Sequence, residues 1–268
     1  MIKLPVRISD SHKGTYGKVA VFGGSMGMAG SVCLAAAAAL RAGAGISFAV
    51  VPKEILEICQ IKLTEVMVKA DTFPKEIFDS VDSLVVGPGY LSKNGISHIM
   101  DIAQQSSKPM VIDAEGLKYI KNIKENKNKN CVITPHPGEF AKLLSVTREE
   151  VNENRKYLAK KYAAENGCTV LLKGKNTVIA SPNGEIVINP TGGSGLSTAG
   201  SGDVLAGIIG GLMAQRMTPF DAAVSGAYIH GLAGDLAEAD ITAYSVMASD
   251  ILNYIGKAFK ECSNGYEL

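Results

Sequence analysis

The 268-residue sequence lacks an excess of charge of either sign: 27 lysine and arginine residues stand against 26 aspartate and glutamate residues, a net charge of +1. Nucleic-acid binders normally carry a basic excess or a basic cluster, so this balance argues against a nucleic-acid partner. The most polar stretch, KNIKENKNKN at residues 121–130, has no aromatic residue on which a base could stack. We therefore interpret it as a solvated surface.

Long hydrophobic runs and paired cysteines are also missing. The longest apolar run, residues 32–40, has nine residues, whereas a membrane-spanning helix needs about 20. The first residues, MIKLP, lack the apolar core of a signal peptide. The five cysteines are scattered and form no CxxC pair, which argues against a disulfide framework or a zinc site. These absences predict a cytoplasmic protein with no membrane partner.

Short apolar runs alternate with helical patterns along the whole chain. The predicted strands are residues 18–23, 46–51, 83–86, 110–112, 131–133 and 169–172. Runs that are apolar throughout are typical of parallel strands covered by helices on both faces. The predicted fold class is therefore α/β with a mainly parallel sheet. No repeat or linker divides residues 1–268, which predicts a single domain.

Local signals add a hairpin and several helices to this prediction. Asn183-Gly184, between the β-rich runs of residues 178–188, indicates a hairpin that contributes an antiparallel pair. Thr218 followed by Pro219 is typical of a helix start. Helical patterns are clearest at about residues 31–41, at 148–165, and almost throughout the chain beyond residue 200.

Glycine is abundant, with 29 residues, and is concentrated near the ends of predicted strands. The clusters are residues 23–30, 87–89, 192–195 and 200–202. In an open α/β sheet, ligands bind beyond the carboxyl ends of the strands, and glycine lets backbone N–H groups approach an anion closely. Tight turns alone would explain one cluster, but four favour a phosphate or nucleotide ligand.

Three common fingerprints are nevertheless absent: GxGxxG, GxxxxGK[ST] and HExxH. The strongest local signal is STAGSGD at residues 197–203, where Gly200, Ser201 and Gly202 precede a helix that we predict to begin near Asp203. Because the N-terminus of a helix binds anions, these three residues are predicted to form an anion hole.

Asp203 lies at the mouth of this predicted anion hole. A carboxylate there can take a proton from a hydroxyl group while that hydroxyl attacks a phosphoryl group. An isolated Gly-Asp pair would favour a simple helix N-cap. The glycine loop that precedes it at residues 192–195 favours a catalytic base instead.

With this motif, the sequence resembles the ADP- or ATP-dependent NAD(P)H-hydrate dehydratase family of the ribokinase-like superfamily. The matching segments span nearly the whole chain: HKGTYG (12–17), GGSMGMAG (23–30), ALRAGAG (39–45), GPG (87–89), DA (113–114), TPHPGE (134–139), LKGKNT (172–177), STAGSGD (197–203) and HGLAGD (230–235). TPHPGE, KGxxT and AGSGD in this order are highly specific, whereas GSGD alone is shared with many small-molecule kinases. The resemblance implies a ribokinase-like three-layer α/β/α sandwich.

The resemblance implies a repair reaction. NADH and NADPH slowly add water to the dihydronicotinamide ring, and family members remove that water by phosphorylating the new hydroxyl and expelling phosphate. Phosphate is a far better leaving group than hydroxide, so the route is chemically sound. The implied substrate is NADHX or NADPHX. The implied co-substrate is ADP (or ATP), and the implied cofactor is Mg²⁺. We expect ADP, converted to AMP, because no epimerase domain is fused to the chain.

The resemblance also assigns site residues. Asp203 matches the catalytic base and, with His136 and the backbone of Ser31, Val32 and Gly89, it matches the contacts to the hydrate. The nucleotide contacts match Lys173, Gly174, Lys175, Asn176, Thr177 and Gly202. Glu139 matches a residue that orders hydrated Mg²⁺ through water. Structural alternatives remain for three of these assignments: Lys173-Gly174-Lys175 as a turn with solvated lysines, His136 as a turn residue, and Glu139 as a cap of the next helix.

Two residues of the resemblance have expected structural roles, and a few positions differ from the usual family pattern. We expect structural roles for His230 and Asp235, because they lie on a helix of small residues. Many family members have Asn where Gly193 stands and Ala-Ala at positions 31–32.

Two alternative functions remain for the sequence. One is a small-molecule kinase of the hydroxyethylthiazole or hydroxymethylpyrimidine kinase type, and the other is a non-catalytic adenylate-binding regulator. Bacterial relatives are commonly tetramers, so we expect a homotetramer.

Overall fold

The computed structural model describes residues 2–72, 74–120 and 128–264, so most of the polar stretch at residues 121–130 lies outside the described residues. The strands are β1 (Lys18–Phe22), β2 (Ile46–Val51), β3 (Met67–Ala70), β4 (Ser83–Val86), β5 (Met110–Ile112), β6 (Cys131–Ile133), β7 (Thr169–Leu172), β8 (Val178–Ala180) and β9 (Ile186–Ile188). All six predicted strands are confirmed, with β1 ending one residue earlier than predicted. The sequence does not predict β3, because its four residues, MVKA, alternate between exposed and half-buried and form no apolar run.

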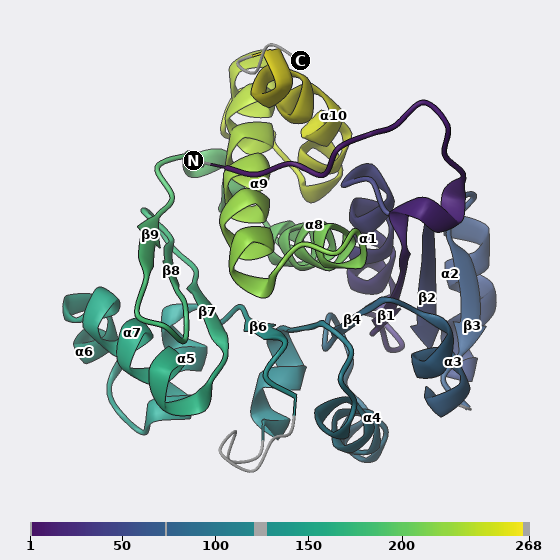
Figure 1. Ribbon diagram of the computed structural model, residues 1–268, viewed down its shortest axis with the longest axis horizontal. Coiled ribbons are helices and arrows are strands. Elements are labelled where there is room, and N and C mark those ends of the chain that lie inside the picture. The colour runs from purple at the N-terminus through teal and green to yellow at the C-terminus, as the bar shows by residue number, and fades with distance from the viewer. Residues whose placement is uncertain (1, 73, 121–127, 265–268) are drawn as a thin grey trace.

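The strands form one sheet in the order β3-β2-β1-β4-β5-β6-β7-β8-β9 (Figure 1). Pairing is parallel from β3 through to β7. The pairs β7–β8 and β8–β9 are antiparallel, which confirms the predicted hairpin around Asn183-Gly184. Because β1 pairs with both β2 and β4, the carboxyl ends of the central strands meet at one edge of the sheet, where α/β proteins bind ligands.

The helices are α1 (Ala29–Arg41), α2 (Leu56–Lys62), α3 (Pro74–Ser80), α4 (Lys93–Gln105), α5 (Pro137–Leu144), α6 (Arg148–Glu153), α7 (Arg155–Asn166), α8 (Ser201–Ala214), α9 (Pro219–Ile241) and α10 (Ala248–Asn264). The prediction of one helix over residues 148–165 is wrong. Asn154 leaves the helical conformation, with φ −119° and ψ 27°, and separates α6 from α7. The predicted start at Pro219 is confirmed, since the Thr218 side chain accepts a hydrogen bond from the backbone N–H of Asp221.

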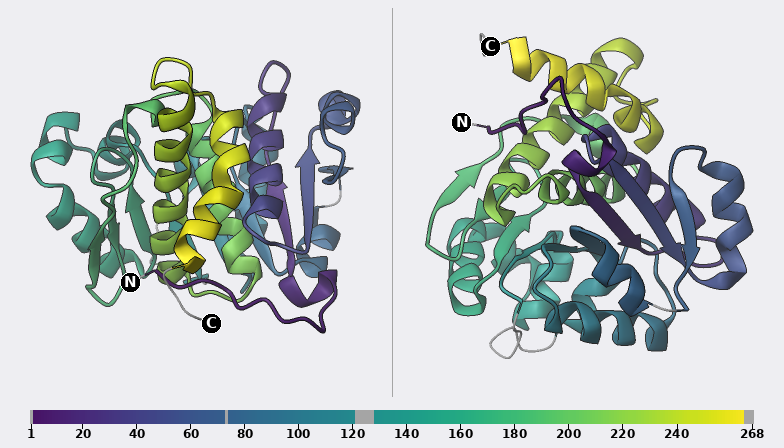
Figure 2. Two further views of the ribbon diagram at one scale, coloured as in Figure 1. Left: turned by 90° about the horizontal axis from the view of Figure 1, so that it is seen from above. Right: turned by 45° about the vertical axis from the view of Figure 1, so that its right-hand side comes forward.

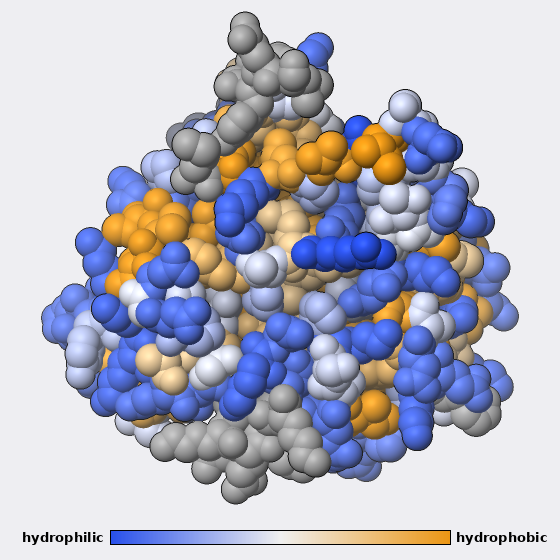
Figure 3. Space-filling view, viewed as in Figure 1, coloured by the Kyte–Doolittle hydropathy of each residue, from blue (hydrophilic) through white to orange (hydrophobic). Residues whose placement is uncertain are grey.

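Helices cover both faces of the sheet, as the predicted three-layer sandwich requires (Figure 2). On β1, Val19 and Val21 face the apolar core beneath α1, α2, α8, α9 and α10, whereas Ala20 and Phe22 face the core beneath α3 to α7. Within the described chain, no helix combines the length and the apolar character that crossing a membrane requires. The face seen in Figure 3 is mostly hydrophilic, and apolar residues gather over the β8–β9 hairpin, where Ile186 and Ile188 are partly exposed.

Helices α1 and α8 pack so closely that glycine is needed between them. A Cβ atom on Gly207 of α8 would lie 2.0 Å from the carbonyl oxygen of Ala35 in α1. At the start of α8, Gly200 has φ +89°, and a Cβ atom there would lie 2.7 Å from the side chain of Leu34. This contact fixes the N-terminus of α8 against α1, and that N-terminus is the centre of the candidate site.

Candidate active site

A cavity of about 350 Å³ lies at the start of α8, within the range of small-molecule pockets. It is bounded by the connection from β6 to α5, the segment after β7, the loop after β9, and α9. The predicted site residues that line it are His136, Lys173, Gly174, Thr177, Ser201 and Gly202. Segments far apart in the sequence thus converge on one cavity.

The N-terminus of α8 supplies free donors to this site. The backbone N–H groups of Gly202 and Asp203 have no hydrogen-bond partner within the described part of the chain. Unpaired N–H groups in the first turn, together with the helix dipole, attract an anion. The helix begins at Ser201, two residues before the predicted start, so both groups belong to its first turn.

His230 of α9 holds the first residue of α8 in place. Its Nε2 lies 2.9 Å from the carbonyl oxygen of Ser201 and 3.1 Å from the Ser201 hydroxyl. A carbonyl oxygen only accepts, so Nε2 carries the proton. Burial lowers the pKa of His230 to about 4, and the ring is therefore neutral at pH 7. This contact agrees with the structural role expected for His230.

Asp203, in the first turn of α8, lies near Ser31, Asp113 and Lys173. Burial and the nearby charge of Asp113 raise the pKa of Asp203 to about 6, while hydrogen bonding from Ser31 and the charge of Lys173 act in the opposite direction. Ser31 in turn lies against Gly89, where an added Cβ atom would be 2.8 Å from that of Ser31. A carboxyl group with this pKa is mainly ionised at pH 7 and can still exchange a proton readily.

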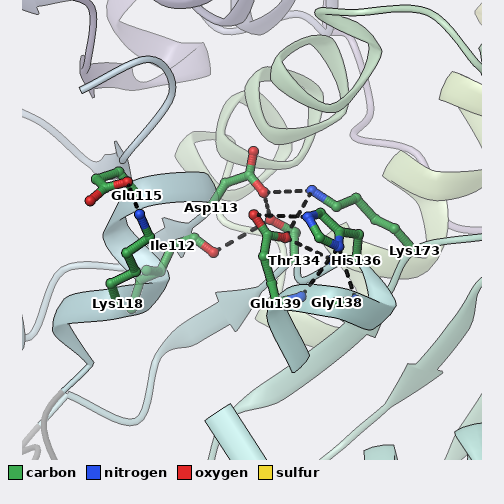
Figure 4. A network of polar contacts seen from close by, with 9 residues as sticks. All are labelled: Ile112, Asp113, Glu115, Lys118, Thr134, His136, Gly138, Glu139 and Lys173. Carbon is green, nitrogen blue, oxygen red and sulfur yellow. Dashed lines mark hydrogen bonds and ion pairs between the residues drawn. The ribbon is translucent and has the colours of Figure 1, made fainter. Parts of the chain in front are cut away.

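Lys173 is held by the buried carboxylate of Asp113 (Figure 4), and its charge acts on Asp203. Its ammonium lies 2.8 Å from Oδ1 of Asp113, which also accepts a 2.7 Å hydrogen bond from the hydroxyl of Thr134. Burial acts to lower the pKa of Lys173, but the carboxylates of Asp113 and Glu139 outweigh it and raise that pKa. The lysine is therefore a fixed positive charge next to Gly202, where an added Cβ atom would lie 3.5 Å from Nζ.

His136 and Glu139 cap α5 reciprocally. Nδ1 of His136 accepts from the backbone N–H groups of Gly138 and Glu139, and the Glu139 carboxylate accepts from the backbone N–H of His136 at 2.8 Å. The capping role that was the alternative for both residues is thus present. It does not remove them from the site, because His136 lines the cavity and Glu139 lies 4.0 Å from the Lys173 ammonium.

The loop of residues 192–195 does not offer its N–H groups to an anion as its glycines had suggested. The N–H groups of Gly192 and Gly193 donate to Asp235 at 2.9 and 2.7 Å, and that of Gly195 donates to Glu238 at 2.8 Å. Two carboxylates on α9 thus tie the loop down, which agrees with the structural role expected for Asp235. An added Cβ atom on Gly193 would lie 2.7 Å from Oε2 of Glu238, so a larger residue there requires Glu238 to move.

The other predicted residues do not line the main cavity: Ser31, Val32, Gly89, Glu139, Lys175, Asn176, Gly200 and Asp203. The side chain of Val32 is fully buried in the core, so only its backbone is free for a ligand contact. Lys175 and Asn176 line a second hollow, beside the start of α7. The glycine cluster at residues 200–202 follows a short 3₁₀ turn, Ser194–Leu196, rather than a strand.

Comparison with known proteins decides which family has this site. A model of the NAD(P)H-hydrate dehydratase family matches residues 19–257. This chain belongs to the NAD(P)H-hydrate dehydratase family. It is 41% identical to a bifunctional NAD(P)H-hydrate repair enzyme of Moorella thermoacetica, over 94% of this chain and 51% of the relative, so the chain spans about half of that protein.

Two further relatives match over most of their own length. An ADP-dependent (S)-NAD(P)H-hydrate dehydratase of Neisseria meningitidis is 40% identical over 86% of this chain and 80% of its own. The crystal structure of an ADP/ATP-dependent NAD(P)H-hydrate dehydratase of Bacillus subtilis, co-crystallised with ATP and Mg²⁺, superposes with a TM-score of 0.89. That structure is 29% identical and covers 96% of this chain and 94% of its own.

Sequence reasoning gave no role to several residues that organise this site. Asp113 follows β5 directly, so its place at the carboxyl end of a central strand was the available signal. Thr134 occupies the equivalent position after β6. Glu238 and Arg155 carry no local signal, because their partners lie in segments distant in sequence.

Proposed function

We propose that this protein is an ADP-dependent (S)-NAD(P)H-hydrate dehydratase, a hydro-lyase that restores NADH or NADPH from NADHX or NADPHX while ADP is converted to AMP and phosphate. The observation that carries the proposal is the Asp203 carboxylate, with its pKa raised to about 6, beside the free N–H groups of α8 and the Lys173 ammonium. A proton acceptor next to an anion site is what transfer of a phosphoryl group to a hydroxyl requires.

The proposed steps use these groups in turn. Asp203 accepts the proton of the hydrate hydroxyl while the hydroxyl oxygen attacks the terminal phosphoryl group of ADP, and AMP leaves. The N–H groups of Gly202 and Asp203, together with Lys173, stabilise the charge that develops on that phosphoryl group. The ring nitrogen then expels phosphate, and loss of a proton from the neighbouring ring carbon restores the double bond.

The other predicted residues divide between the two ligands. We assign the backbone of Ser31, Val32 and Gly89, with His136, to the hydrate. We assign the segment 173–177, with Gly202, to the nucleotide. The support is that Lys173, Gly174 and Thr177 line the cavity at α8. Ser31 is hydrogen-bonded to Asp203 and lies against Gly89.

We propose Mg²⁺ as the metal that accompanies the nucleotide. Within the described residues, no group of three or more His, Cys, Asp or Glu side chains is arranged to hold a metal. This fits Mg²⁺, which usually keeps several waters and binds through one or two carboxylates and the substrate phosphates. Glu139 would order one of those waters, and the ion would neutralise phosphate charge when bound.

The test is direct repair of the hydrate. The protein is incubated with NADHX and Mg²⁺ plus either ADP or ATP, and the return of dihydronicotinamide absorbance is followed. We expect return with ADP, together with AMP and phosphate in equal amounts. No return with either nucleotide would refute the dehydratase proposal, and a stable phosphorylated product would favour the small-molecule kinase.

We further propose that residues 1–268 act as one ribokinase-like domain in a cytoplasmic homotetramer. Exposed apolar side chains support self-association: Ile61 of α2 is 86% exposed, and Met247 before α10 is 59% exposed. Light scattering coupled to size-exclusion chromatography measures the mass, and a monomer at micromolar concentration would contradict the tetramer.

A further inference from the structure

The guanidinium group of Arg155 lies against the segment that follows β7. Arg155 is the first residue of α7, and its Nη2 donates to the carbonyl oxygens of Leu172 at 2.9 Å and Lys173 at 3.3 Å. These are the last residue of β7 and the residue whose ammonium lies beside Asp203. One side chain thus binds two successive carbonyl groups at the carboxyl end of a central strand.

Gly174 allows this close approach. It has φ +138°, and a Cβ atom there would lie 2.6 Å from Nη1 of Arg155. A larger residue at this position would be strained by the positive φ and would require the Arg155 guanidinium group to move. The Arg155 contact and the glycine of the KGxxT segment depend on each other.

Arg155 is placed there without a counter-charge. No carboxylate lies within ion-pair distance of it in the described part of the chain, and its buried Nε has no hydrogen-bond partner there. Burial also lowers the pKa of the guanidinium group. A partly buried cation with an unsatisfied donor costs free energy, which its hydrogen bonds to the segment after β7 must offset.

What it holds is the backbone of Lys173. The N–H of Lys173 donates to the carbonyl oxygen of Pro135 at 2.9 Å, and its carbonyl oxygen accepts from Arg155. We propose that Arg155 is a positioning residue for phosphoryl transfer: it fixes the Lys173 backbone so that the ammonium stays between Asp113 and the N-terminus of α8. This inference rests on the proposed function and adds a residue to it.

A double-mutant cycle tests this directly. R155A is expected to lower kcat/KM for ADP about 10- to 100-fold, the loss that follows from a charge-assisted hydrogen bond. Because Arg155 acts through Lys173, the same change in a K173A background is expected to have almost no further effect. Losses that multiply in the double variant would overturn the proposal, because Arg155 would then act independently of Lys173.

Chemical rescue separates positioning from folding. Arg155 borders the hollow that Lys175 and Asn176 also line, about 520 Å³ in volume, so a free guanidinium ion can reach the space that R155A vacates. Millimolar guanidinium chloride is expected to restore activity to R155A and not to K173A, with sodium chloride at equal ionic strength as the blank. R155K, which cannot donate from a planar fork, is expected to recover less than the rescued variant. Failure of guanidinium to rescue a folded R155A would overturn the proposal.

Matched controls keep the outcomes distinct. K156A removes the adjacent exposed cation from the same hollow and is expected to leave kcat/KM unchanged. Circular dichroism establishes that each variant is folded at the assay temperature. If the native protein does not repair the hydrate, the proposed function fails. The double-mutant cycle then uses the dissociation constant for ADP, measured by calorimetry, as its readout. Additive losses of ADP affinity there would overturn the role of Arg155 by themselves.

Discussion

Replacing Asp203 with asparagine is expected to abolish repair and to stabilise the fold. Burial and the charge of Asp113 raise the pKa of Asp203 from 3.8 to about 6. A shift of about two units corresponds to about 3 kcal/mol that the ionised carboxylate costs the native state at pH 7. Asparagine keeps the shape without the charge, so D203N is expected to gain about 1 to 3 kcal/mol, because the buried amide retains part of the cost.

Two assays on one sample measure the two effects. The rate of hydrate repair is expected to fall about 10²- to 10⁴-fold, the usual contribution of a general base. The dissociation constant for ADP, measured by calorimetry, is expected to keep its order of magnitude. Urea unfolding at pH 7 is expected to show the gain in free energy, and thermal unfolding a midpoint higher by about 2 to 4 °C per kcal/mol. D203N that retained repair would refute the role of Asp203 as the base.

The pH dependence checks the physical cause. The cost of the ionised carboxylate is fully present above the native pKa of about 6 and disappears as the pH falls toward the unfolded value of 3.8. The stability advantage of D203N is therefore expected to shrink between pH 6 and pH 4, and the activity of the native enzyme to fall below about pH 6. An advantage that stays constant over this range would contradict an electrostatic origin.

Three further perturbations follow from the packing around the site. G207A is expected to lower the free energy of unfolding, measured in urea, by about 3 kcal/mol or more, because the added methyl group meets the Ala35 carbonyl. The control G256A places its methyl group where nothing lies within 4 Å and is expected to raise that free energy by up to about 1 kcal/mol. Equal effects of the two substitutions would contradict the packing argument. His230 is buried with a pKa of about 4, so unfolding at falling pH is expected to become easier between pH 6.5 and about 4, by up to about 3 kcal/mol, and H230N is expected to remove this slope. E238Q is expected to weaken ADP binding about 3- to 10-fold by loosening the loop of residues 192–195, measured by calorimetry, and unchanged affinity would show that the loop holds its shape without that carboxylate.

Strands and helix starts were largely predictable because their signals are local. Uninterrupted apolar runs identified six strands, and Asn183-Gly184 identified the hairpin. The edge strand β3 and the helix break at Asn154 were not predicted, because an exposed edge strand has no apolar run and the break contains no glycine or proline. Tertiary packing settles such positions, and short-range propensity does not.

The candidate site was predictable only where one segment carries its own chemistry. STAGSGD contains both the donors and the carboxylate, so the N-terminus of α8 and Asp203 were found from seven consecutive residues. The glycines of residues 192–195 helped to predict a phosphate ligand, but the sequence did not show that their N–H groups donate to carboxylates more than 40 residues later, on α9. A glycine pattern indicates where a backbone is accessible and cannot tell what already binds it.

The sequence by itself therefore determined the layered α/β fold, the family resemblance and the place of the proposed base, Asp203, because apolar periodicity and contiguous motifs act over short distances. Only the tertiary structure decided which charges surround that carboxylate. Lys173 meets Asp113 across 60 residues of chain and Arg155 supports Lys173 from a separate helix. Parallel strands bring these residues to one edge of the sheet, and burial there gives their charges the strength that sets the pKa of Asp203.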